Sequence, residues 1–226
     1  MDQAYADKLE EIFRLHANID NVQPMEAYMR NQFPFLGIRN PERVALMKRF
    51  YKDNGIPAGQ EAVETAKAWW RLPEREFHYA AMDMLLKSRK DMPPKHVELL
   101  EEWVLTHPWW DTVDFIAPNL IGFHLQQYPK LTTNYVDKWL SSEQMWLQRT
   151  AILFQLKYKQ NTDTELLFAV VRRMSGSREF FIRKAIGWAL REYSKTDAAA
   201  VQAFVKSTEL SPLSQKEALK VIQRNG

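Results

Sequence analysis

The sequence predicts an all-α fold, an α-solenoid in which helix pairs are stacked one on the next. Glycine occurs only seven times in 226 residues, whereas average usage near 7% would give about sixteen. Leu, Ala, Lys, Glu, Gln and Arg, which favour helix, are abundant. No stretch alternates apolar and polar residues for long enough to demand a sheet. A faint repeat of 34–36 residues supplies the third observation.

The repeat is aligned on five alanines, spaced 36, 36, 34 and 34 residues apart: Ala45, Ala81, Ala117, Ala151 and Ala185. The residue three positions after each alanine is apolar, except for Lys48 in the first repeat. A helix pair that recurs with this period is typical of an α-solenoid, in which each pair packs only on its neighbours. We therefore expect residues 1–226 to form a single repeat domain whose concave surface binds an extended partner.

The repeat alignment predicts the following helices and loop, given in order from the N-terminus. Residues 1–20 have the pattern of a polar amphipathic helix, and a loop rich in Pro and Gly at 32–43 leads into the first clear repeat. One helix of each pair is expected at 41–51, 74–88, 111–123, 145–158 and 179–193, and second helices are expected at 93–105, 131–141 and 163–174. Thr162-Asp163 opens the last of these and Ser175-Gly-Ser closes it, and the final helix has Pro212 near its first turn.

Composition excludes several kinds of chemistry. The chain has no cysteine, so disulfides, thiolate catalysis and cysteine-ligated metals are excluded. The five histidines are scattered without ligand spacing, and we expect neither a metal nor another cofactor. No apolar run approaches the ~18 residues that span a membrane, and the N-terminus does not resemble a signal peptide. We expect an intracellular, cytoplasmic protein.

Positive charge is concentrated in the second half of the chain. The formal net charge is +3, but the segment from Arg149 to Lys195 holds ten Lys or Arg residues against four acids. Such a segment suits a polyanion such as a phosphate backbone, and it is also compatible with ordinary solvated helix faces.

The stretch Thr106–Phe115, THPWWDTVDF, places aromatic and acidic side chains together. In a helix, Trp110 and Asp114 lie one turn apart on one face. By spacing alone this pair is more often an interface tryptophan and a surface acid than a catalytic pair. We assign Trp109 to packing and Asp111 to helix capping or a surface ion pair.

Several longer phrases, taken together, are more specific. NQFPFLGIRNPER, LPEREFHYAAMDML, WWDTVDFIAP, WLQRTAILFQLKYK and FFIRKAIGWALREYSKT resemble the AlkD-type DNA alkylation-repair glycosylases, in order and spacing, from about Met25 to Lys220. The resemblance implies HEAT-like repeats that wrap one side of a DNA duplex. It also implies hydrolysis of the N-glycosidic bond of cationic N-alkylated purines such as 7-methylguanine and 3-methyladenine, without a base-flipping pocket, by a monomer that leaves an abasic site.

The resemblance also assigns the site residues. Asp114, Trp110 and Trp188 match the family's catalytic set, and Arg149 matches a contact to the DNA backbone. Tyr28 matches a position near the DNA. Arg39 departs from the family's shorter polar residue, which puts DNA contacts of that loop in doubt.

Residues near Trp188 add two further DNA-binding candidates, Arg191 and Lys195, about one and two turns on; surface charges are the alternative for both. Trp188 itself lies in an apolar stripe, where a core tryptophan is the usual reading. Gly187 weakens the helix by roughly 1 kcal/mol against Ala, which indicates close approach by another group.

These residue types suit the chemistry. An N-alkylated purine already carries positive charge and leaves without a strong acid, so the difficulty is the cationic sugar left behind. Asp114 would supply negative charge and orient the attacking water. Trp110 and Trp188 would place π-electron density beside the developing cation and exclude water.

Two alternatives stay open at this point. A solenoid can keep its shape without chemistry, as a non-catalytic HEAT-repeat module that binds DNA or protein. A glycosylase with lyase activity would instead need an amine for a Schiff base. The lysine close to Trp110 or Trp188 is Lys184, which a basic helix face explains, so a monofunctional hydrolase is the favoured prediction.

Overall fold

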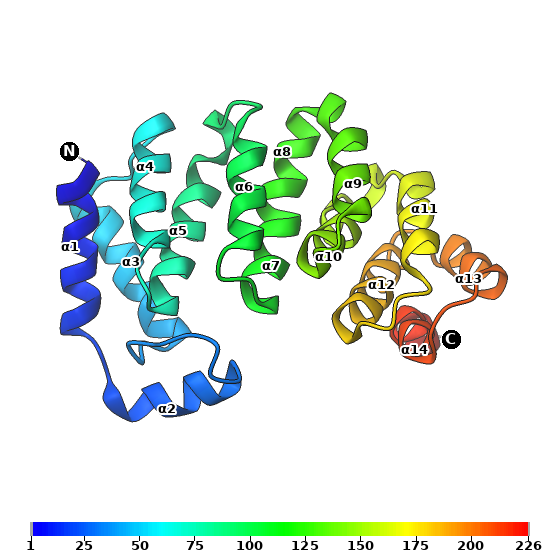
Figure 1. Cartoon of the computed structure of the whole chain (residues 1–226), viewed down its shortest axis with the longest axis horizontal. Coiled ribbons are helices and arrows are strands. Elements are labelled where there is room, and N and C mark those ends of the chain that lie inside the picture. The colour runs from blue at the N-terminus through cyan, green and yellow to red at the C-terminus, as the bar shows by residue number, and fades with distance from the viewer. Residues whose placement is uncertain (1, 226) are drawn as a thin grey trace. The chain divides into compact units, whose positions relative to one another are not determined.

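The structure, a computed structural model, describes residues 2–225 and the side chains of residues 4–224 (Figure 1). Within these residues the chain is helical and contains no strand, so the prediction of an all-α fold is confirmed. Contacts divide the chain into two compact units, Met1–Met92 and Pro93–Gly226. The single domain over residues 1–226 stays a prediction.

The first unit contains five α-helices among its described residues: α1 (Asp2–Leu15), α2 (Ile19–Tyr28), α3 (Asn40–Asn54), α4 (Gly59–Trp70) and α5 (Arg75–Ser88). The helix expected over residues 1–20 ends at Leu15, because the side chain of Asn18 caps α2 by accepting from the N–H of Asp20 at 3.1 Å. Helix α1 packs on α3 and α4, and the indole N–H of Trp69 donates to the carbonyl of Ala6 at 3.1 Å.

A buried carboxylate holds the loop that precedes α3. The side chain of Glu76 accepts the backbone N–H groups of Leu36, Gly37 and Ile38 at 3.1, 2.9 and 3.0 Å. Gly37 has φ +85°, and a Cβ there would lie 2.0 Å from the carbonyl oxygen of Asn18. Both features require glycine at this position.

The second unit contains the remaining helices. They are α6 (His96–Leu105), α7 (Trp110–Ile116), the π-helical segment η2 (Ala117–Ile121), α8 (Gly122–Gln127), α9 (Thr132–Ser141), α10 (Met145–Leu153), α11 (Thr164–Met174), α12 (Phe180–Tyr193), α13 (Ala198–Ser207), α14 (Pro212–Leu219) and α15 (Ile222–Asn225). Short 3₁₀ turns occur at Pro129–Leu131 and Lys159–Asn161 (η4) in this unit, and one at Arg89–Asp91 in the first unit.

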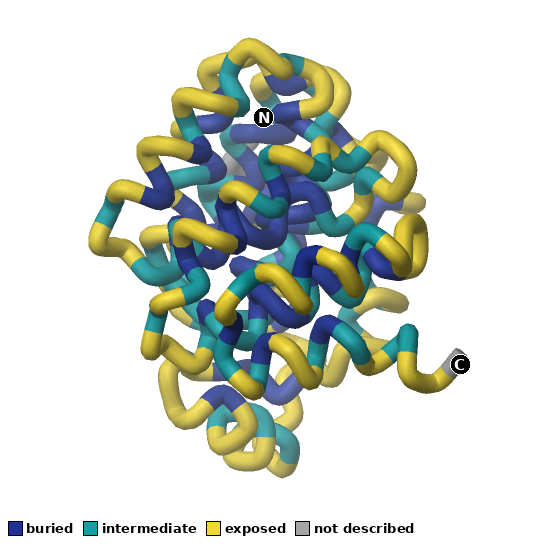
Figure 2. Tube along the Cα trace, turned by 90° about the vertical axis from the view of Figure 1, so that its right-hand side faces the viewer, coloured by how far each residue is buried: buried dark blue, intermediate teal, exposed yellow. Residues whose placement is uncertain are grey.

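Helix pairs stack in this unit as a solenoid requires (Figure 1). The partners of each pair pack on each other, α9 on α10, α11 on α12 and α13 on α14, and α10, α12 and α14 pack in sequence. Buried and exposed residues alternate along the turns of these helices, as they do in amphipathic helices (Figure 2). The predicted helix ends are confirmed where Asp163 caps α11 through the N–H of Leu166 and where Pro212 begins α14.

The structure also differs from the sequence-based expectations. The predicted helix over 111–123 is divided by η2, and the predicted helix over 145–158 is α-helical only to Leu153. Helices α4 and α13 were not expected from the pattern. No helix in the described part of the chain combines the length and apolar character needed to cross a membrane.

Candidate active site

The N-terminal end of α7 carries the first two candidate residues. Trp109 is the extended residue that precedes the helix, and its carbonyl accepts the N–H of Val113 at 3.1 Å. Trp110 is the first helical residue and Asp114 follows one turn later, so both side chains lie on one face of α7. His107, in the loop that enters α7, has φ +52°, a left-handed conformation that non-glycine residues seldom adopt.

The helix widens within one turn after Asp114, from Ala117 on. Pro118 has no N–H to donate to the carbonyl of Asp114, four residues earlier. The backbone changes to π-helical spacing over Ala117–Ile121, where the N–H of Gly122 donates to the carbonyl of Ala117. Single π turns of this kind occur frequently at functional sites.

Asp114 forms a two-point ion pair with Arg149 of α10. Nε of Arg149 donates to Oδ1 of Asp114 at 2.7 Å, and Nη2 donates to Oδ2 at 2.9 Å. The third nitrogen, Nη1, donates to the backbone carbonyl of Phe181 in α12. The Arg149 side chain is 5% exposed and that of Asp114 is 19% exposed. One guanidinium therefore links α7, α10 and α12 and fixes the direction of the carboxylate.

The protonation of Asp114 is set by opposing influences. Burial raises the pKa of its carboxyl group above the ordinary value, because a low-dielectric surrounding disfavours the charged form. The hydrogen bonds and charge of Arg149 act in the opposite direction, and the nearby Asp111 raises the pKa slightly further.

Three aromatic rings pack around the Arg149 link. Trp109, Trp146 and Phe181 have ring centroids 5.0 to 5.9 Å apart. They come from the residue before α7, from α10 and from α12, so the cluster joins the same three elements as Arg149. The prediction that Trp109 packs is confirmed, and Trp146 and Phe181 are members that the sequence analysis did not single out.

Trp188 lies in α12, seven residues or about two turns after Phe181, and its side chain is part-exposed. The close approach indicated by Gly187 is made by α14: a Cβ at Gly187 would lie 2.5 Å from Cβ of Glu217 and 3.0 Å from the carbonyl oxygen of Ser214. Helix α14 thus packs against the backbone beside Trp188.

The basic candidates on α12 and immediately after it are paired within the protein. Arg191 donates to Oε2 of Glu217 at 2.6 Å, and Lys184 donates to Oε1 of the same carboxylate at 2.9 Å. Lys195 pairs with Glu192 at 2.6 Å and stays 51% exposed. A phosphate would compete with these carboxylates, so DNA contacts by Arg191 and Lys195 stay predictions.

The first unit carries the other two candidates. Tyr28, at the end of α2, is 70% exposed. Arg39 is an exposed residue immediately before α3. Their predicted proximity to DNA stays a prediction.

The Asp114–Arg149 pair was not predicted from the sequence, where Arg149 is expected to contact a phosphate. The signal was present in the repeat register, because Asp114 and Arg149 are 35 residues apart, about one repeat. Residues one repeat apart lie side by side on stacked helices. No cluster of three or more histidine, aspartate or glutamate side chains with metal-binding geometry occurs among residues 2–225.

The fold and this site define an all-helical repeat protein with a part-buried carboxylate that is held by an arginine. Residues 9–222 match the family model for the DNA alkylation repair enzyme family, and the chain belongs to that family. The chain is similar to a solved structure described as a predicted DNA alkylation repair enzyme from Enterococcus faecalis, with 33% identity and a TM-score of 0.82 over 90% of this chain and 95% of that chain. No curated protein matches the sequence.

Proposed function

We propose that this protein is a monofunctional AlkD-type DNA glycosylase that hydrolyses the N-glycosidic bond of cationic N-alkylated purines in duplex DNA. Its products would be the free base and an abasic site. The family membership supports a role in repair of alkylated DNA. The observation that carries the finer proposal is the Asp114 carboxylate, fixed by Arg149 on the same helix face as Trp110.

The arrangement suits a reaction with a cationic transition state. As the bond to 7-methylguanine or 3-methyladenine breaks, positive charge develops on the deoxyribose, and the base departs as a neutral molecule. A carboxylate held in a part-buried site stabilises that charge more than it would in water. Asp114 would also accept a proton from the attacking water, while Trp110 and Trp188 would pack against the sugar.

The state of Asp114 supports this role. Arg149 opposes the effect of burial on the pKa of the carboxyl group and so favours the charged form that the reaction needs. Since the guanidinium donates one hydrogen bond to each oxygen, each oxygen retains acceptor capacity for a water molecule. Arg149 would then position Asp114 in addition to, or in place of, binding a phosphate.

Two further features of the proposal concern the substrate and the assembly. Recognition through the DNA backbone, without a base-flipping pocket, predicts that adducts larger than methyl are removed as well. Cleavage of a bulky N7 adduct slower than that of 7-methylguanine by orders of magnitude would contradict this feature.

We also propose that the protein acts as a monomer, which a measurement of its mass in solution tests. The Lys184 amine is paired with Glu217, which favours hydrolysis over Schiff-base lyase chemistry.

One observation favours the second candidate, a non-catalytic DNA-binding module. Both oxygens of Asp114 are bonded to Arg149 and the side chain is 19% exposed, as in an ion pair that only joins two helices. Under this alternative the pair would stabilise the repeat stack and carry no chemistry.

Single-turnover release of 7-methylguanine from a duplex oligonucleotide distinguishes a glycosylase from a non-catalytic DNA-binding module. We expect release by the wild type and a loss of at least ~10²-fold in Asp114→Asn, because the variant loses the charge that stabilises the transition state. DNA affinity should stay unchanged. The matched control is Asp111→Asn, which removes a carboxylate from the same helix and should retain activity. Binding without release by the wild type would establish the non-catalytic module.

A further inference from the structure

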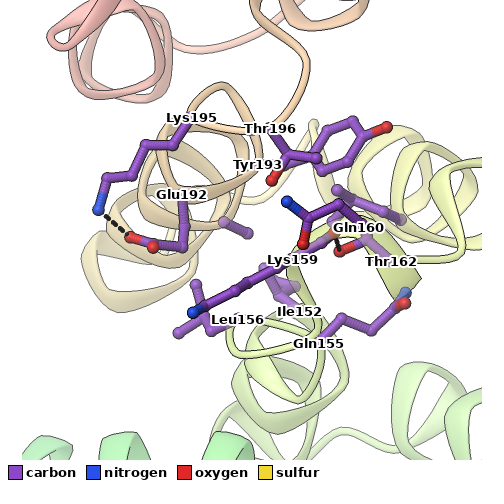
Figure 3. A pocket seen from close by; sticks show the side chains of 12 residues that line it. Ile152, Gln155, Leu156, Lys159, Gln160, Thr162, Glu192, Tyr193, Lys195 and Thr196 are labelled. Carbon is purple, nitrogen blue, oxygen red and sulfur yellow. Dashed lines mark hydrogen bonds and ion pairs between the residues drawn. The ribbon is translucent and has the colours of Figure 1, made fainter.

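A cavity of about 170 Å³ lies between the end of α10 and the end of α12 (Figure 3). Ile152 and Ala189 contribute to its apolar wall, and three charged side chains, Lys159, Glu192 and Lys195, line it. The cavity lies within the second unit. Lys159 and Gln160 belong to η4, the turn between α10 and α11.

Lys159 is unusual in its backbone and in its side chain. Its φ of +52° is left-handed, a conformation that favours glycine, and its side chain is directed across the cavity mouth (Figure 3). Its ammonium group has no hydrogen bond or ion pair with any side chain of residues 4–224. Lys159 thus adopts a disfavoured conformation that places an unpaired cation at the cavity.

Lys195 is the second cation, and its charge is balanced by Glu192 at 2.6 Å; the Lys195 side chain is exposed to solvent and that of Glu192 is part-exposed. In Figure 3 the two ammonium groups extend to the same side of the cavity, with the Glu192 carboxylate between them. The mouth therefore carries two cations and one anion. An oxyanion that took the place of Glu192 would neutralise Lys195 and meet the unpaired Lys159.

The position along α12 relates this cavity to the candidate active site. Glu192 follows Trp188 by four residues, so it lies on the same helix face one turn, about 6 Å, further on. Each strand of duplex DNA carries one phosphate per 3.4 Å along the helix axis. A strand whose deoxyribose packs on Trp188 would therefore present phosphates to the cavity within about two nucleotides.

We propose that this cavity is a phosphodiester-binding subsite that holds the DNA backbone about two nucleotides from the lesion, with Lys159 and Lys195 as the contacting cations. In the absence of DNA, Lys195 forms its ion pair with Glu192, and this ion pair breaks when the phosphate binds to Lys195. The proposal rests on the proposed function, since it requires DNA at Trp188.

Binding of undamaged duplex DNA, measured by fluorescence anisotropy over a series of salt concentrations, tests the subsite. Loss of one phosphate contact makes the negative slope of log Kobs against log salt shallower by about 0.9, so Lys159→Ala should show this change. Lys206→Ala removes one positive charge from an exposed position on α13 and should leave the slope unchanged. Glu192→Gln should tighten binding by about 3-fold at low salt, because it frees Lys195 from its partner.

Two results would overturn the subsite. One is a salt slope for Lys159→Ala equal to that of Lys206→Ala. The other is saturable binding of inorganic phosphate, followed by NMR shifts at Lys159 and Lys195, with no change in the DNA slope, which would make the cavity a site for a small free anion. Excision by the wild type is measured alongside. Normal excision by the wild type together with an unchanged salt slope for Lys159→Ala would contradict only the proposed subsite. No excision by the wild type would contradict the proposed glycosylase function.

Discussion

Arg149 acts on the candidate active site by holding the carboxylate of Asp114. Its three hydrogen bonds go to Asp114 and to the carbonyl of Phe181, and its side chain is almost fully buried. Removing one member of a buried ion pair leaves an uncompensated charge, which typically costs about 3–5 kcal/mol. The effect on catalysis depends on whether the guanidinium positions Asp114 or binds a DNA phosphate.

The pH dependence of excision distinguishes these roles. The reactive form of Asp114 is the carboxylate, so activity should fall as the pH drops through its raised pKa. Because Arg149 opposes the effect of burial, Arg149→Gln should raise that pKa further and move the acidic limb to higher pH. Single-turnover rates with saturating enzyme, measured at several pH values, test this shift.

Arg149→Lys is the matched control, since it keeps the positive charge and should restore part of the shift. If Arg149 bound only a phosphate, the acidic limb would stay in place and DNA affinity alone would fall. Thermal unfolding of each variant should be recorded as well, because a folded protein is required for the comparison.

Glu76 offers a prediction about stability at a single residue. Its carboxylate accepts three backbone N–H groups from the loop before α3. Glu76→Gln replaces one acceptor oxygen by an NH₂ group, which leaves a buried backbone donor facing another donor. We expect a loss of about 2 kcal/mol in the free energy of unfolding, measured by urea denaturation. Glu11→Gln, an exposed change on α1, should cost little; equal losses would contradict the role of the loop contact.

At the scale of elements, the contact between α12 and α14 depends on the absence of a side chain at Gly187. Alanine favours helix by about 1 kcal/mol over glycine. A Cβ here, however, would lie 2.5 Å from Cβ of Glu217 and 3.0 Å from the carbonyl oxygen of Ser214, and such overpacking costs about 1–3 kcal/mol. Gly187→Ala should therefore destabilise the protein by about 1 kcal/mol and slow excision, because α14 shifts beside Trp188.

Gly176→Ala is the control, since a Cβ at Gly176 meets no atom within 4 Å. Urea denaturation and single-turnover excision on both variants would test the prediction. Stability of Gly187→Ala at or above that of Gly176→Ala would mean that α14 does not approach α12 so closely.

The elements also show which features a sequence pattern can predict. Most helices of the second unit, though not α13, were predictable because apolar residues recur with the helical period and because Asp163 and Pro212 mark helix starts. The π segment after Asp114 was not, although Pro118 was visible, because a proline can also kink or end a helix. The Asp114–Arg149 pair joins residues 35 positions apart and becomes apparent only when the repeat register is converted into spatial neighbours.

For the whole molecule, the repeat register bears on the number of domains. Contacts separate Met1–Met92 from Pro93–Gly226, yet Ala81 and Ala117, on either side of that boundary, keep the spacing of 36 residues found between Ala45 and Ala81. In a continuous array each repeat is stabilised by its neighbours, so adjacent repeats unfold together when their coupling is strong. The sequence thus predicts one cooperative domain.

Urea unfolding followed by hydrogen exchange in peptides from both units tests this prediction. We expect one transition with a common midpoint for the two units. Glu76→Gln, which acts within the first unit, should lower that midpoint equally in peptides from both, because a single cooperative transition has one free energy of unfolding. The control is Glu11→Gln, which should shift neither set. A midpoint lowered only in peptides from residues 1–92 would mean that the chain consists of two domains and that the second, which holds the candidate catalytic residues, folds independently of the first.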